Sequence, residues 1–138
     1  DKSAESFINS LKTDTKNKYI EDNKKLLMNA AFALYNNGIT AYNKKDYSRA
    51  IECYSKIIDI IPYDDTKTLA RNNVSDGVLY INCYYAAVEM KDMNKAKKYL
   101  DKLINIGYND PLIYVYMSRI LVGEKDTVAA LSYIEKGR

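Results

Sequence analysis

The stretch KDYSRAIECYSKIIDIIPYD, at residues 45–64, has two later counterparts: KDMNKAKKYLDKLINIGYND at 91–110 and KDTVAALSYIEKGR at 125–138. The three stretches align without gaps. The offset is 46 residues from position 45 to position 91, and 34 residues from position 91 to position 125. A sequence that repeats itself at such spacings indicates stacked copies of one supersecondary unit.

Four places in this repeat hold the same residue type every time, and two of them indicate the structure. The first place is aspartate and the second, four residues later, is alanine: Asp46 and Ala50, Asp92 and Ala96, Asp126 and Ala130. An aspartate at a helix start accepts a hydrogen bond from a free backbone N–H and lies at the positive end of the helix dipole. An alanine on a helix face lets a second helix approach to about 8–10 Å. The repeat therefore predicts pairs of packed helices.

This pattern resembles the tetratricopeptide repeat, a unit of 34 residues with a large residue at place 4, a small one at 8, alanine at 20, an aromatic at 24 and proline at 32. Residues 31–64 match it with Leu34, Gly38, Ala50, Tyr54 and Pro62. The resemblance, which extends to bacterial tetratricopeptide-containing proteins, implies an all-α fold. We expect a right-handed helical-repeat solenoid of about three helix pairs behind an N-terminal helical segment.

The resemblance divides the chain into five segments. These are an N-terminal helical segment at 1–30, a first repeat at 31–64, an insert at 65–76, a second repeat at 77–110 and a third repeat at 111–138 that lacks its last six places. The second repeat departs from the pattern at places 8 and 32, with Tyr84 and Tyr108. The incomplete third repeat predicts that further repeats follow in the protein.

Two segments outside the repeats also carry helical patterns. Within 1–30, Ser3 is a potential cap for a short helix with Phe7, and from about Thr15 the pattern is consistent with a helix that runs on into 31–43. We read 65–76 as an N-terminal extension of the second repeat's first helix, with Thr66 as a potential cap and Asp76–Gly77 as a potential break. The alternative is a loop, because this insert is rich in asparagine, serine and aspartate, which are poor helix formers.

Composition excludes several classes of function. The chain has 138 residues and a net charge of +3, which is too weak a charge to argue for nucleic acid. No apolar run is long enough to span a membrane, and no signal peptide is visible. The sequence does not decide between cytoplasm and periplasm. Cys53 and Cys83 have no metal-ligand spacing, so we read them as small buried hydrophobes, with a single disulfide as the alternative.

An enzymatic role is not expected. The chain has no histidine, which removes the commonest general base and the commonest metal ligand. It has no glycine-rich phosphate-binding loop. The adjacent carboxylates Glu21–Asp22 and Asp64–Asp65 lie in polar surroundings and are read as surface charge. We therefore expect no catalytic residue, no cofactor and no metal site.

The resemblance implies a function in protein–protein interaction. In this family the first helices of the repeats line a concave face that takes a peptide or a partner domain. The candidate groove has nine residues. The family's lining places supply Tyr35, Ile39, Tyr42, Asn43, Tyr85, Glu89 and Arg119, and the places of its peptide clamp supply Asn82 and Tyr116. Tyrosines suit such a groove because each buries a large area and offers a hydroxyl group.

Three other readings are weighed against this one. The heat-shock clamp of the family needs several basic residues, and of its places only Asn82 fits here, so we do not expect that ligand. The chain is alternatively a structural segment of a longer repeat protein, with its groove covered by residues 1–15 or by later helices. The third reading is self-association through exposed ends of the solenoid.

Overall fold

The computed structural model describes residues 17–138, and every regular element among them is helical. The helices are α2 (Asn17–Asn43), α3 (Tyr47–Ile60), α4 (Thr68–Arg71), α5 (Asp76–Glu89), α6 (Met93–Asn105), α7 (Leu112–Gly123) and α8 (Thr127–Lys136), with one 3₁₀ turn, η1 (Ile61–Tyr63). The prediction of an all-α helical repeat is confirmed. Residues 1–16, with the short helix expected after Ser3, lie outside the described part of the chain.

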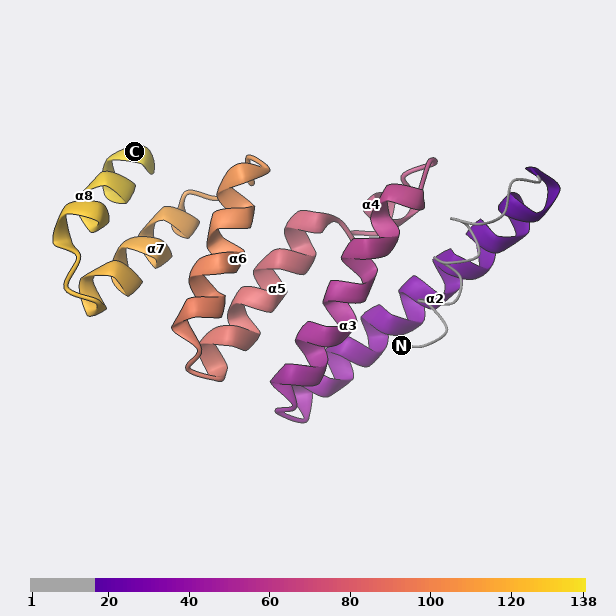
Figure 1. The fold of residues 1–138 in the computed structure, drawn as a ribbon, viewed down its shortest axis with the longest axis horizontal. Coiled ribbons are helices and arrows are strands. Elements are labelled where there is room, and N and C mark those ends of the chain that lie inside the picture. The colour runs from indigo at the N-terminus through magenta and orange to yellow at the C-terminus, as the bar shows by residue number, and fades with distance from the viewer. Residues whose placement is uncertain (1–16) are drawn as a thin grey trace.

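The helices form three antiparallel pairs that follow one another along the long axis of the molecule (Figure 1). The pairs are α2 with α3, α5 with α6, and α7 with α8. Successive pairs are joined because α3 also packs on α5, and α6 packs on α7. The predicted helix from about Thr15 into 31–43 is one continuous helix, α2.

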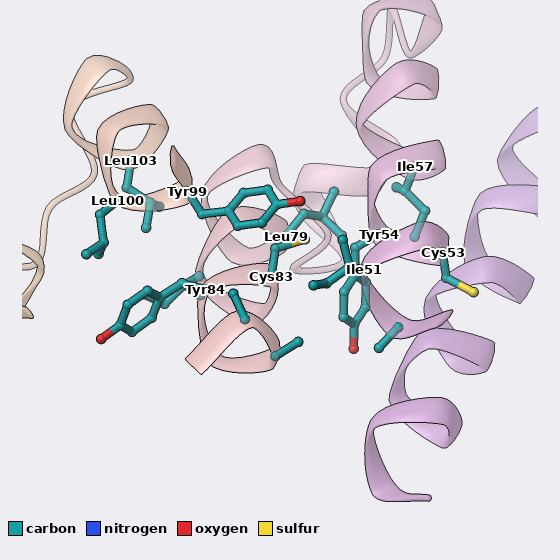
Figure 2. Close-up of a cluster of buried hydrophobic side chains, with 14 of the residues drawn as sticks. Ile51, Cys53, Tyr54, Ile57, Leu79, Cys83, Tyr84, Tyr99, Leu100 and Leu103 are labelled. Atoms are coloured by element: carbon teal, nitrogen blue, oxygen red, sulfur yellow. The ribbon is translucent and has the colours of Figure 1, made fainter. Parts of the chain in front are cut away.

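The recurring alanines lie inside these pairs. Ala50 and Ala96 are fully buried, and Ala130 is 2% exposed. Around them the core runs without interruption from α2 to α8. Figure 2 shows its middle part, where Ile51, Tyr54 and Ile57 of α3 lie beside residues of α5 and α6.

The recurring aspartates have two structural roles, of which the sequence indicated one. The carboxylates of Asp46, Asp92 and Asp126 each accept a hydrogen bond from the backbone N–H three residues later, at 3.1 to 3.3 Å. This caps the second helix of each pair as predicted. The N–H of each aspartate also donates to a carbonyl five residues earlier, for example from Asp46 to Ala41 at 2.8 Å. One residue therefore ends a helix and begins the next.

A lysine precedes each of these aspartates and has a left-handed backbone. The φ angles of Lys45, Lys91 and Lys125 are 64°, 60° and 65°. This conformation is normally taken by glycine, and it costs other residues about 1–2 kcal/mol. The turns are therefore closed at a conformational cost.

The insert at 65–76 does not extend the following helix, so that prediction is wrong. The short helix α4 ends at Arg71, Asn73 has a φ of 64°, and α5 begins at Asp76 after a new N-cap, Ser75. Thr66 is not the cap of α4. The carboxylate of Asp64 accepts hydrogen bonds from the N–H groups of Thr68 and Leu69, at 3.0 and 2.7 Å. These local side-chain contacts stabilise a separate turn of helix.

Gly38 on α2 lets the ring of Tyr54 on α3 approach closely. A Cβ added at Gly38 would lie 2.6 Å from Cε1 of Tyr54. In the second pair the sizes are exchanged, because the place of Gly38 is taken by Tyr84 and the place of Tyr54 by Leu100. Leu100 is fully buried, whereas the ring of Tyr84 points away from Tyr54 (Figure 2). The second pair thus sends its large side chain toward the third.

We expect Lys45→Gly to stabilise the fold by about 0.5–1 kcal/mol, because glycine takes a positive φ without strain but loses more entropy on folding. Urea unfolding followed by circular dichroism measures the change. Lys44→Gly is the control. Lys44 donates its N–H to the carbonyl of Thr40 as in a helix, so a glycine at this position should lower the stability of the fold. An unchanged or lowered midpoint for Lys45→Gly would contradict the expectation.

Gly38→Ala should destabilise the fold by about 1–3 kcal/mol, because the added methyl overlaps the Tyr54 ring. The matched substitution is Gly123→Ala, where a Cβ would meet no atom within 4 Å. That change should be neutral or stabilising by up to about 1 kcal/mol, since alanine favours helix over glycine. Equal effects of the two substitutions in urea unfolding would refute the close-approach argument.

Candidate partner-binding groove

A first hollow of about 300 Å³ lies where α2 and α5 face each other across α3. Its lining consists of Tyr35, Ile39, Tyr42, Asn43, Tyr54, Asn82 and Tyr85. Six of these seven residues belong to the groove predicted from the sequence. Tyr54 is the residue that sequence reasoning missed, because its place in the repeat indicated a buried core aromatic. Tyr54 is indeed 2% exposed, and it contributes to this hollow from α3.

Ring contacts hold the tyrosines of the first hollow in place. Tyr35 lies with its ring centroid 6.1 Å from that of Tyr54, and Tyr42 packs edge-on against Tyr47 at 5.1 Å. Such aromatic pairs stabilise by about 0.5–1.5 kcal/mol beyond the area that they bury. The walls of the hollow are thus preformed rather than assembled from free side chains.

Glu89 is placed at the margin of this hollow and not in its lining. Burial raises the pKa of the Tyr42 hydroxyl, and the carboxylate of Glu89 raises it further. The predicted residue Glu89 therefore lies close enough to act on Tyr42 through its charge, while its own side chain is exposed.

A second hollow of about 480 Å³ lies between α5 and α7, next to the turn that joins α5 to α6. Its lining consists of Tyr84, Val88, Met93, Tyr116, Arg119, Ile120, Gly123 and Glu124. The predicted residues Tyr116 and Arg119 are found here, so the structure divides eight of the nine candidates between two hollows and leaves Glu89 outside both linings. The sequence feature that could have indicated this second hollow is Tyr84, a large residue at a place where the repeat pattern has a small one.

Three tyrosines separate the two hollows. The ring of Tyr84 stacks on that of Tyr116, with centroids 5.2 Å apart and planes 17° from parallel. Tyr85 lies 5.5 Å from Tyr84 and belongs to the first hollow. Burial raises the pKa of Tyr85 to about 12, and the neighbouring hydroxyl group of Tyr116 adds to the effect. We call Tyr84, Tyr85 and Tyr116 the tyrosine ridge.

Two charged side chains line the second hollow, and only one of them has an ion-pair partner within residues 17–138. The carboxylate of Glu124 is paired with the ammonium group of Lys97 at 2.7 Å. Arg119 is exposed and forms no ion pair with any residue that the structure describes. The hollow therefore presents one uncompensated guanidinium group beside an aromatic wall.

The reactive side chains of this region are held in unreactive forms. Cys53 and Cys83 are free and buried, and burial raises the pKa of Cys83 to about 12. A thiol with so high a pKa is a poor nucleophile at neutral pH. Within residues 17–138 no three metal-ligating side chains come together, and no helix is long and apolar enough to cross a membrane.

The tyrosines predict a dependence of stability on alkaline pH. Burial raises the pKa of Tyr54, Tyr85 and Tyr99 to about 12, against about 10 in an unfolded chain. The folded chain then holds more protons than the unfolded chain between about pH 10 and 12, so stability is complete below about pH 10 and falls as pH rises through this window. Tyrosinate absorbance should rise later in the native protein than in denaturant; coincident titrations would refute this.

The comparisons with known proteins agree with this architecture. A family model described as "Tetratricopeptide repeat" matches residues 31–64, the span from the middle of α2 to the residue after η1. No curated protein and no solved structure matches the chain. The matched repeat supplies the first helix pair and five residues of the first hollow. The match thus identifies residues 31–64 as a tetratricopeptide repeat within an all-α helical-repeat fold.

Proposed function

We propose that this chain is a protein-interaction module that binds an extended segment of a partner protein in the first hollow, on the concave face expected of a tetratricopeptide solenoid. One observation carries the proposal. Two successive first helices, α2 and α5, present three tyrosines with Ile39 and two asparagines around one hollow of about 300 Å³, and Tyr54 of α3 adds a fourth tyrosine. The family is typically non-enzymatic, which fits the unreactive cysteines.

The side chains of the hollow match the needs of peptide binding. Tyrosine and isoleucine offer apolar area, and Ile39 and Tyr85 remain 39% and 41% exposed, so a ligand has surface to bury. The carboxamides of Asn43 and Asn82 both donate and accept hydrogen bonds, as the backbone of an extended peptide does. A volume of about 300 Å³ lies at the lower end of the usual range for ligand sites.

The test is a pull-down from lysate of the source organism with the full chain as bait. The double variant Ile39→Ala/Tyr85→Ala should capture at least about tenfold less partner than the wild type, because truncation of each anchor residue costs about 1–2 kcal/mol of binding free energy. Ile106→Ala is the matched control, since Ile106 is 42% exposed and lies outside both hollows. Circular dichroism verifies that each variant is folded.

Two results would defeat the proposal. If wild type and double variant retrieve the same proteins, the first hollow is not the contact. If neither retrieves any, the hollow is better read as a structural feature that the protein's own chain fills.

Self-association is a second candidate function, favoured by the outer face of α8. Val128, Leu131 and Ile134 follow one another at three-residue spacing and are 80%, 63% and 41% exposed. The counterparts of Leu131 and Ile134 in the first repeat are Ile51 and Tyr54, which are buried. An apolar stripe of this kind on a helix marks a contact surface.

If copies of the chain associate through this stripe, the mass of the wild type in sedimentation equilibrium should rise with concentration. Leu131→Glu should keep the chain monomeric, because a charge would be buried without a partner. Ser132→Glu adds the same charge to an exposed position beside the stripe and should leave association unchanged. A wild-type mass that stays at the monomer value at all concentrations excludes this candidate.

A further inference from the structure

The second hollow has features that the first hollow lacks, and they indicate what it binds. It is larger, at about 480 Å³ against about 300 Å³, and it lies on the far side of the tyrosine ridge. The ridge belongs to both hollows, since Tyr85 lines one and Tyr84 and Tyr116 line the other. An extended segment bound in the first hollow can therefore continue across the ridge into the second.

The wall of the second hollow is apolar and aromatic. Val88, Met93 and Ile120 line it together with the stacked rings of Tyr84 and Tyr116. Met93 is 37% exposed, so part of this wall is accessible to a ligand. A flexible methionine and a flat pair of rings adapt well to a large apolar side chain, aromatic ones above all.

The charge at the hollow selects for an acid. Glu124 is the one carboxylate among the described lining residues, and its pairing with Lys97 leaves it neutralised. The guanidinium of Arg119 has no such partner among residues 17–138. It also lies close to the rings: burial and Tyr116 raise the pKa of Tyr84, and the charge of Arg119 opposes them. The planar guanidinium group of Arg119 offers several N–H donors beside an apolar wall. This combination fits a carboxylate that follows an apolar side chain.

We propose that the second hollow binds an apolar residue, and Arg119 an adjacent acidic residue, of the same partner segment that occupies the first hollow. This inference rests on the proposed function and adds a sequence preference to it. The segment presents an Asp or Glu side chain next to a large apolar side chain, at a fixed distance from the part that enters the first hollow.

Gly123 offers a way to fill the second hollow without disturbing the fold. It lies in the last turn of α7 and lines the hollow, and a Cβ added there would meet nothing within 4 Å. Gly123→Leu therefore places a side chain into the space that a ligand would use. Asn105→Leu is the matched control, because it adds the same side chain at the exposed end of α6, outside both hollows.

The experiment is a selection of binders from a random peptide library displayed in an internal loop, with the full chain as the target. The wild type should enrich peptides in which Asp or Glu adjoins an aromatic or aliphatic residue. Arg119→Gln should still enrich the apolar residue but lose the preference for the acid. If the acid is not enriched, or is enriched equally by Arg119→Gln, the inference is overturned while the proposed function stands.

A selection that yields no binding peptide overturns both, because the proposed function then fails as well. Affinities of the best selected peptide complete the test. Arg119→Gln should weaken binding by about three- to tenfold, as expected for one partly exposed charge pair. Gly123→Leu should weaken it by at least about tenfold and Asn105→Leu not at all. Unchanged affinity in folded Gly123→Leu, verified by circular dichroism, overturns the assignment of the second hollow.

Discussion

Close approach of paired helices is the constraint on which this structure depends. Ala50, Ala96 and Ala130 are at most 2% exposed, and each lies on the second helix of a pair. A larger side chain at such a place would force the pair apart and cost about 1–3 kcal/mol. Because each pair also packs on the next through α3 on α5 and α6 on α7, a change in one crossing would act first on the neighbouring pair.

The hollows depend on which helix of each pair carries the large side chain at the point where the two helices cross. In the first pair the small residue, Gly38, is on the first helix and Tyr54 fills the space from the second. In the next pair Leu100 is on the second helix, and Tyr84 on the first helix turns toward α7, where it stacks on Tyr116. One exchange of sizes therefore closes the core of the second pair and also builds the aromatic wall between the second and third pairs.

Sequence reasoning recovered the features that recur and missed those that occur once. The aspartate caps and the buried alanines were predictable because the same local chemistry appears three times. Six residues that line the first hollow were named from the sequence, because the repeat that it resembles assigns them lining or clamp places; that they bind a partner stays a prediction. The separate helix α4 was not, because it depends on the carboxylate of Asp64 and the positive φ of Asn73, and neither leaves a periodic signal. The left-handed backbone of Lys45, Lys91 and Lys125 was not predictable either, because a lysine side chain does not favour a positive φ.

The connector between α3 and α5 also explains why the repeats are unequally spaced, since it holds the residues by which the 46-residue offset exceeds 34. It lies at the opposite edge of the row from the turns after α2 and α5, beside which the hollows open (Figure 1). Ala70 on α4 is exposed, and both native thiols are buried with raised pKa values. A cysteine in place of Ala70 would thus be the one reactive thiol among residues 17–138, and a dye attached to it would report on binding from outside the groove.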